Sequence, residues 1–261
     1  MPRTDELSPL LELCEAAAKL GGAELLRLRG TAASREKAPR DFVTDADLAS
    51  QEAIRRVVAD AYPEHGFLGE ESEDFAQLES EYCWVVDPLD GTTNYVHDFP
   101  FFAVSVAVCF RGQVVAGAVF DPLRQECFAA ALGHGAELNG QPIRASETTE
   151  INEALVAASL PPQVSSDDAD LNSMLRVSPA CRAIRRTGSA ALNLAYVASG
   201  RMDAHWAHSI RPWDAAAGVL LITEAGGVVT SSTGGDFRIE EPNYLAAATG
   251  ELHSAVLALL A

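Results

Sequence analysis

The sequence predicts a mixed α+β and α/β protein with two different sheets. Helical periodicity opens the chain, strand-like stretches joined by hairpin signals follow from Cys83, and short strands alternate with helices after the middle. A polar stretch, "RASETTEINEA", separates the last two patterns, so we place the boundary near residues 145 to 152. The expected domains are residues 1–148, of α+β type, and residues 149–261, of α/β type.

Two helices are predicted first. In "SPLLELCEAAAKLGGAELLRLR" Ser8 is a candidate cap, proline takes the first helical position, and apolar residues recur at helical spacing, with a weak point at Gly21-Gly22. In "VTDADLASQEAIRRVVADAYP" Thr44 is a candidate cap. Asp47, three residues later, completes a pattern that resembles a capping box with the shorter acid.

The strands and the remaining helices follow. "CWVVD", "FFAVSVAVCF" and "QVVAGAVF" are predicted strands, and the last two are joined by a hairpin signal at Arg111-Gly112. Asn139-Gly140 predicts another turn. In the second part we expect strands at 155–160, 181–186, 203–209 and 227–231, and helices at 189–199 and 213–226.

Composition limits the classes of partner. The 261 residues are 48% hydrophobic, which is enough for a full core, and 19 Lys+Arg against 37 Asp+Glu give a formal net charge of -18. This charge repels phosphate backbones and anionic lipid, so we expect neither nucleic acid nor a membrane as partner unless bound metal reverses the sign locally.

Cysteine usage and the N-terminus predict a soluble, cytoplasmic protein. The five cysteines are odd in number, scattered and without a CxxC pair, so neither a disulfide framework nor a zinc site is indicated. Among them, Cys109 and Cys127 lie between apolar residues and are expected in the core. Acidic residues occupy the N-terminus where a signal peptide needs bases, and no apolar run approaches the ~18 residues of a membrane span.

Three segments place acids where a secondary-structure element begins or ends. In "VVDPLDGTTN" Asp87 and Asp90 flank Pro88-Leu89 at the end of an apolar strand, where we expect the chain to turn and bring both carboxylates to one point. Hard divalent cations prefer such oxygens. The alternative is a surface turn with two solvated aspartates.

The other two acidic segments are ambiguous by themselves. Glu70-Glu71 in "GFLGEES" is typical of a solvated loop, and Asp214 in "RPWDAAAG" is also an ordinary helix cap. If a helix begins near Thr92, however, the amides of Gly91 and Thr92 would form an anion cradle beside the acids. Carboxylates, metal and an anion cradle together indicate phosphate chemistry.

Four motifs, in order, resemble the inositol monophosphatase-like family of metal-dependent, lithium-sensitive phosphatases. They are "VTDAD" (43–47), "GEES" (69–72), "DPLDGTTNYVHDFPFFAVSVAV" (87–108) and "PWDAAAG" (212–218). The resemblance spans most of the chain. It implies a layered αβαβα sandwich of the sugar-phosphatase type with two sheets, Mg²⁺ as cofactor, a small phosphorylated metabolite as substrate and a homodimer.

The resemblance also implies a ligand set. Glu70, Asp87 and the carbonyl of Leu89 would hold a first Mg²⁺, and Asp87 would bridge to a second ion held by Asp90 and Asp214. A third, weaker ion would lie near Glu70, which counts among the catalytic residues as well. Most ligands thus belong to the first domain and Asp214 to the second.

Further residues are assigned to water and substrate by the same resemblance. Asp47 and the Thr92 hydroxyl would orient the attacking water, and the amides of Gly91 and Thr92 would hold phosphate. "RRTGSAALN" resembles the substrate loop of the family. That loop would place three residues near the leaving group: Gly188, Ser189 and Ala190.

Substrate preference is where this chain departs from the family pattern. Relatives that take inositol phosphates commonly carry a glutamate seven residues before the aspartate of the "WD" pair, and here that position is Ala207. The loss of a hydrogen-bonding anchor predicts shallow discrimination among small phosphomonoesters. Histidinol phosphate, a nucleotide 3'-phosphate and fructose 1,6-bisphosphate are alternatives to a phosphorylated polyol.

Two alternatives concern histidines and the enzyme class. His205 or His208 would partly replace the missing glutamate, but a spacing of three on a strand points them to opposite faces and argues against a metal pair. A regulatory binding protein on a phosphatase fold is the non-enzyme alternative. The presence of every expected metal ligand favours the enzyme.

Overall fold

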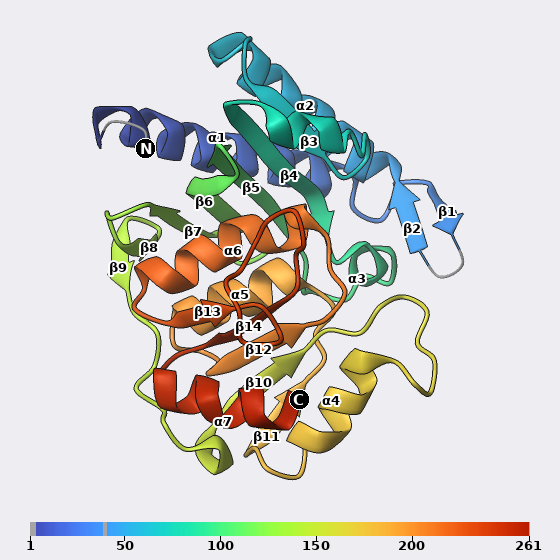
Figure 1. Cartoon of the computed structure of the whole chain (residues 1–261). Helices are drawn as coiled ribbons and strands as arrows, with labels where there is room; N and C mark the ends of the chain where they lie inside the picture. Colours follow the sequence, from blue (N-terminus) through green and yellow to red (C-terminus); the bar gives the residue numbers. More distant parts are fainter. Residues whose placement is uncertain (1–3, 39–40, 261) are drawn as a thin grey trace.

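Two sheets alternate with three layers of helices (Figure 1). The structure is a computed structural model that describes residues 4–38 and 41–260. Outer helices α1 (Thr4–Leu28) and α2 (Asp45–Ala61) cover the first sheet, α5 (Ala190–Ala198) and α6 (Pro212–Glu224) lie between the sheets, and α4 (Ala169–Val177) and α7 (Gly250–Leu260) form the opposite outer layer. The predicted αβαβα sandwich is therefore confirmed.

The first sheet has seven strands in the order β3-β4-β5-β6-β7-β8-β9. Only the β3–β4 pair is parallel, and Arg111-Gly112 and Asn139-Gly140 form two-residue turns with positive φ at each position. The predicted hairpins are thus confirmed. Its strands are β3 (Gly66–Gly69), β4 (Tyr82–Asp90), β5 (Ala103–Phe110), β6 (Gln113–Asp121), β7 (Glu126–Ala131), β8 (Ala136–Leu138) and β9 (Gln141–Ile143).

The second sheet has five strands in the order β11-β10-β12-β14-β13. The strand β10 pairs in parallel with β11 and β12, as expected where helices connect strands, and β14 is antiparallel to both of its neighbours. The strands are β10 (Leu155–Ala158), β11 (Ala183–Arg185), β12 (Ala204–Ala207), β13 (Val228–Thr230) and β14 (Tyr244–Ala247). The sequence reasoning missed β14, α4 and α7.

The two sheets share a core. Buried residues of β4, β5, α5, α6 and β12 belong to one apolar cluster, because α5 and α6 pack between the sheets. The first sheet ends at Ile143 and the second begins at Leu155. A division into domains at residues 148 and 149 stays a prediction.

The first helix begins earlier than predicted and is not interrupted at the suggested weak point. It begins at Thr4 instead of near Ser8, so that Pro9 lies inside it, and it continues through Gly21-Gly22 to Leu28. A Cβ at Gly21 would come within 2.6 Å of Ser50 Oγ in α2, and one at Gly22 within 2.6 Å of the Phe120 ring in β6. The glycines are therefore positions of close packing and not a break.

The remaining elements are short. A hairpin of β1 (Ser34–Ala38) and β2 (Asp41–Thr44) leads into α2, and α3 (Thr92–Val96) follows β4. Two 3-10 turns span Phe75–Glu79 and Ile151–Glu153. Within the described residues, every helix is too short or too polar to cross a bilayer. Cys109 and Cys127 are buried, as predicted, and burial raises the pKa of both thiols.

Candidate active site

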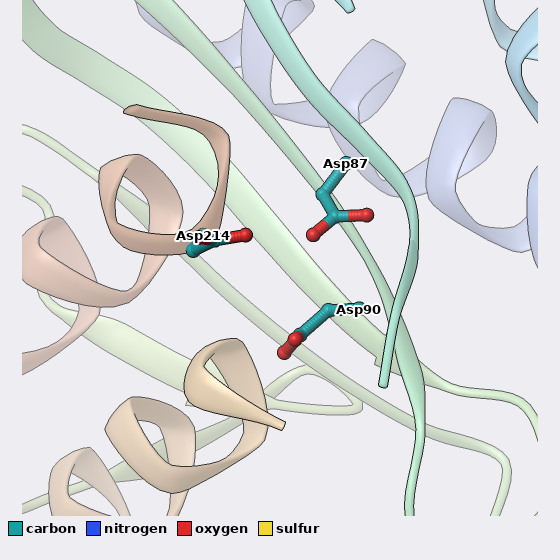
Figure 2. A group of neighbouring side chains, drawn as sticks. All are labelled: Asp87, Asp90 and Asp214. Carbon is teal, nitrogen blue, oxygen red and sulfur yellow. The ribbon is translucent and has the colours of Figure 1, made fainter. Parts of the chain in front are cut away.

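Three aspartates from two distant segments converge between the sheets. Asp87 and Asp90 lie at the end of β4 and Asp214 lies in the first turn of α6, and each offers a carboxylate oxygen within 4.8 Å of the others. Figure 2 shows the three side chains around a common space. Asp87 is 1% exposed and Asp90 8% exposed, so the charges are withdrawn from bulk water.

A β-bulge brings the two aspartates of β4 to the same place. We expected a turn after Asp87, but the strand continues to Asp90: Asp87 pairs with Ser105 and Asp90 with Ala103, with a shift of register between them. In a regular strand, side chains three residues apart point to opposite faces, and one extra residue restores them to one face. Pro88, which has no backbone donor, is suited to the bulge.

Two of these aspartates also bond to helix N-termini. Asp90 Oδ2 accepts hydrogen bonds from Ser189 Oγ (2.6 Å) and from the amide of Ala191 (2.7 Å), which fixes it against α5. Asp214 Oδ2 accepts from the amide of Arg211 (3.0 Å). The cap interpretation of Asp214 is therefore correct, and it is compatible with metal binding because a carboxylate has two oxygens.

Asp47 and Thr92 meet beside the bulge. The capping box at Thr44 and Asp47 is confirmed, and it leaves Asp47 Oδ1 3.3 Å from Thr92 Oγ1. The same hydroxyl lies 3.0 Å from the carbonyl oxygen of Leu89. As expected, a helix begins at Thr92, after Gly91 with φ 94°. A Cβ at Gly91 would lie 3.0 Å from the Phe101 carbonyl, so a glycine is required there.

Glu70 follows β3 and faces the same space from another side. Its amide donates to the carbonyl of Val86 (3.1 Å), and its Oε1 lies 3.2 Å from Lys37 Nζ in the β1–β2 hairpin. Lys37 also pairs with Glu71. Among the described residues, Glu70 is not one of the group within 4.8 Å, and its present partner is a lysine. No signal in the sequence pointed to Lys37.

A cavity of about 440 Å³ opens over these acids. The predicted residues Glu70, Asp87, Leu89, Asp90, Gly91, Thr92, Gly188, Ser189, Ala190 and Asp214 all line it. So do residues that the sequence reasoning missed, among them Asn94, Ser159, Arg186 and Ser209. Arg186 is the one cationic residue of this described lining, and it is exposed at the surface.

Ala207 and the two histidines lie elsewhere. Ala207 is fully buried in β12 and is not among the described residues that line the cavity. His205 contacts Tyr244 and Ser159, whereas His208 Nε2 lies 2.8 Å from Ser173 Oγ. The two histidines therefore bond to different residues. Neither lines the cavity directly.

Comparison with known proteins decides the family. Residues 6–261 match the profile of the inositol monophosphatase family. The chain belongs to this family. It is 39% identical over 233 residues to the Nus factor SuhB of Escherichia coli, covering 88% of this chain and 87% of that protein. It is 36% identical over 229 residues to the inositol-1-monophosphatase of a Synechocystis species, covering 87% and 80% respectively.

Solved structures of the inositol monophosphatase family have the same fold. The extragenic suppressor protein suhB from Bartonella henselae superimposes with a TM-score of 0.91 at 36% identity, covering 97% of this chain and 98% of that chain. The inositol monophosphatase from Anabaena gives 0.86 at 34% identity, with 98% and 96% covered. The family resemblance that the motifs indicated is thus confirmed.

The electrostatics of the acidic group favour a bound cation. Burial, and then the charges of Glu70 and Asp90, raise the pKa of Asp87 well above its usual range. Burial and then the charge of Asp214 raise the pKa of Asp90 to about 7, and burial raises that of Glu70 to about 8 in spite of Lys37. At neutral pH, bound protons or cations must therefore compensate the negative charge of these carboxylates.

The donor set fits a hard divalent ion. Asp87, Asp90 and Asp214 offer only carboxylate oxygens, and the group contains neither sulfur nor imidazole. Leu89, whose carbonyl oxygen lies 3.0 Å from Thr92 Oγ1, lines the same cavity. The residues present could therefore hold a metal ion, in keeping with the metal dependence of the family.

Proposed function

We propose that this protein is a Mg²⁺-dependent phosphomonoesterase that hydrolyses a small phosphorylated polyol or a related metabolite. The observation that carries the proposal is the convergence of Asp87, Asp90 and Asp214 within 4.8 Å at a cavity that also contains the start of α3. Carboxylates, a helix N-terminus and a cavity of metabolite size are the parts that phosphate-ester hydrolysis needs.

Two Mg²⁺ ions would be held by Asp87, Asp90, Asp214, Glu70 and the carbonyl of Leu89. When bound, Mg²⁺ lowers the pKa of water and neutralises charge that develops on the leaving oxygen. The Oε1 atom of Glu70 lies 3.2 Å from Lys37 Nζ, so Glu70 would have to release Lys37 in order to bind the ion. A third ion near Glu70 would compete with the same lysine.

Asp47 and Thr92 would orient the attacking water. The Thr92 hydroxyl has one proton and lies within hydrogen-bonding distance of two acceptors, Asp47 Oδ1 and the carbonyl of Leu89. When it donates to Asp47, its lone pairs can accept from a water. Burial raises the pKa of Asp47 to about 6, so that this carboxyl can exchange a proton near neutral pH.

Phosphate would be held by backbone amides and attracted by one cation. The amides of Gly91 and Thr92 begin α3, where partial positive charge gathers. Arg186 brings a guanidinium to the rim of a cavity whose other charged residues are acidic. Gly188, Ser189 and Ala190 would face the leaving group.

The proposed inhibitor rests on family membership, and the proposed substrate range rests on the alanine at position 207, although Ala207 itself is buried in β12 and does not line the cavity. We propose a broad or non-inositol preference, and we include histidinol phosphate, a nucleotide 3'-phosphate and fructose 1,6-bisphosphate beside inositol 1-phosphate. Lithium inhibition, a homodimeric state and a cytoplasmic location belong to the same proposal.

A phosphate-release panel tests it. Purified protein would be incubated with each of the four esters, with Mg²⁺ or with EDTA, and with Ala207→Glu measured in parallel after its fold is checked by thermal unfolding. We expect Mg²⁺-dependent release from at least one ester, preferences within about tenfold of one another, and a gain for inositol 1-phosphate in Ala207→Glu. A hundredfold preference of the wild type for inositol 1-phosphate, with no effect of Ala207→Glu, would contradict the substrate assignment.

A regulatory binding protein is the second candidate. Several relatives at 39% identity carry the name Nus factor SuhB, which does not name a phosphatase activity. Absence of turnover for every ester of a broad panel in Mg²⁺ would favour this candidate.

A further inference from the structure

A buried histidine lies directly behind the wall of the cavity. His205, on β12, is 0% exposed; its Nδ1 lies 3.0 Å from the Tyr244 hydroxyl and its Nε2 3.1 Å from Ser159 Oγ. Ser159 lines the cavity, whereas His205 does not. Burial lowers the pKa of His205 to about 3, so the ring is neutral and has one donor and one acceptor. The hydroxyls of Tyr244 and Ser159 can each donate or accept a hydrogen bond, so they suit either tautomer of the ring.

A second branch of hydrogen bonds connects the same imidazole to the substrate loop. His205 Nε2 lies 3.4 Å from Asn193 Nδ2, and Asn193 Oδ1 accepts from Thr187 Oγ1 (2.7 Å). The carbonyl of Thr187 in turn accepts from Asn94 Nδ2 (2.8 Å). The branch thus runs from β12 through α5 to the residue before Gly188 and on to α3.

The surroundings of Ser159 are apolar. In the segment 158–162, which lines the cavity, the other side chains are Ala158, Leu160, Pro161 and Pro162. Ser159 therefore supplies the single side-chain hydrogen-bonding group of this stretch of wall, and His205 holds that group. Of the three hydrogen-bond partners of His205 among the described residues, Ser159 lines the cavity, and Asn193 bonds to Thr187, the residue before the cavity-lining Gly188.

His253 provides a comparison within the same part of the fold. It is 6% exposed, its Nε2 lies 2.9 Å from Thr230 Oγ1, and neither residue lines the cavity. Both histidines are buried and bonded to a hydroxyl, so they differ in where that hydroxyl lies. Because the partner of His205 lines the cavity and that of His253 does not, His205 is suited to positioning a cavity residue, whereas His253 has only a structural role.

We propose that His205 is a positioning residue that holds Ser159 as a hydrogen-bonding contact for a hydroxyl group on the substrate's leaving group. The inference rests on the proposed phosphatase function and specifies the leaving group as hydroxylated. Ser159 would thereby supply a hydrogen-bonding side chain in an otherwise apolar stretch of the cavity wall. The second branch would hold the loop at Thr187 in register with α3 while the ester binds.

The test compares two esters that differ in hydroxyl groups. Inositol 1-phosphate has a hydroxylated leaving group, whereas p-nitrophenyl phosphate has none. We expect Ser159→Ala and His205→Asn to lower kcat/KM for inositol 1-phosphate about three- to tenfold, mainly through KM, which is the size of one neutral hydrogen bond. Values for p-nitrophenyl phosphate should stay within about twofold.

Conservative variants separate positioning from folding. The amide of glutamine reaches the place of Nε2 and that of asparagine the place of Nδ1, so His205→Gln should recover most of the loss that His205→Asn causes. Ser159→Ala combined with His205→Asn should lose no more than Ser159→Ala alone, because both act through one contact. His253→Gln is the matched control and should lower kcat/KM for neither ester selectively. Thermal unfolding checks that each variant is folded.

Four outcomes would overturn the inference. Equal losses for both esters in the folded variants would show a structural role, and unchanged kinetics of Ser159→Ala would show that no contact exists. Hydrolysis of p-nitrophenyl phosphate with no hydrolysis of inositol 1-phosphate would overturn this inference alone. Failure of the wild type to hydrolyse these two esters and every other ester of the panel with Mg²⁺ would overturn the proposed function, and this inference with it.

Discussion

Asp90 Oδ2 accepts a 2.6 Å hydrogen bond from the hydroxyl of Ser189, a residue 99 positions later in the chain. The same hydroxyl accepts from the amide of Leu192 (3.3 Å) and so caps α5. One serine therefore connects a proposed metal ligand on the first sheet to the helix that follows the proposed substrate loop.

Removal of this hydroxyl should weaken both metal binding and folding. We expect Ser189→Ala to raise the Mg²⁺ concentration for half-maximal activity about tenfold or more, since partners that orient ligands commonly contribute that much. Stability should fall by about 0.5–2 kcal/mol in urea unfolding. Asp168→Ala, which removes the side-chain cap of α4, is the control: it should cost similar stability and leave the Mg²⁺ dependence unchanged.

Neutralising Asp214 should abolish turnover and preserve the fold. Asp214→Asn removes one carboxylate of the group within 4.8 Å, so phosphate release should fall by several orders of magnitude. Without metal the variant should unfold at the same temperature as the wild type or higher, because a like charge has gone. Asp203→Asn is the control. It should lower the unfolding temperature and leave phosphate release unchanged, since Asp203 accepts hydrogen bonds from Ser146 Oγ and the Leu155 amide. Near-normal activity of Asp214→Asn would rule out the two-metal assignment.

The metal-free protein should lose stability as pH rises. In the folded state, burial raises the pKa of Asp47 to about 6, of Asp90 to about 7 and of Glu70 to about 8. The folded chain therefore binds more protons than the unfolded chain between about pH 4 and pH 8, and stability falls across this window. Thermal unfolding in EDTA should show the decrease, and Mg²⁺ should flatten it. A decrease that Mg²⁺ leaves unchanged would argue against metal binding by these groups.

The hydroxyl of Thr92 should affect catalysis more than binding. Thr92→Val removes the group that lies 3.3 Å from Asp47 Oδ1, so kcat should fall about 10²-fold or more while KM changes only a few-fold. Thr92→Ser keeps the hydroxyl and should retain most activity. Steady-state kinetics of the pair provide the measurement, and equal losses in both variants would assign Thr92 a packing role instead.

Lithium should inhibit the proposed phosphatase activity. A small monovalent ion that enters a magnesium position after catalysis would hold phosphate in place without completing the charge. We expect uncompetitive inhibition at millimolar Li⁺, measured by initial rates at several substrate concentrations. Indifference at several hundred millimolar would count against kinship with the lithium-sensitive members of the family.

Local patterns in the sequence were sufficient for most elements. The capping box at Thr44, the hairpins at Arg111-Gly112 and Asn139-Gly140 and the helix that begins at Thr92 all depend on interactions within a few residues, and all are confirmed. The predicted start of α1 was wrong, and the weak point suggested at Gly21-Gly22 does not interrupt the helix. Glycines are needed at these two positions because a larger side chain would clash with Ser50 and Phe120, which lie far away in the sequence.

The sequence by itself determined the fold class, the family and the residue types of the site, because periodicity, turn residues and motif spacing are written along the chain. Only the tertiary structure decided how these residues meet. A bulge, not a turn, aligns Asp87 with Asp90, Lys37 reaches Glu70 across the hairpin, and His205 lies behind Ser159 instead of in the cavity. Sequence periodicity does not specify these contacts. They depend on strand register and on the packing of layers, which burial and hydrogen bonding fix between residues that are far apart in the sequence.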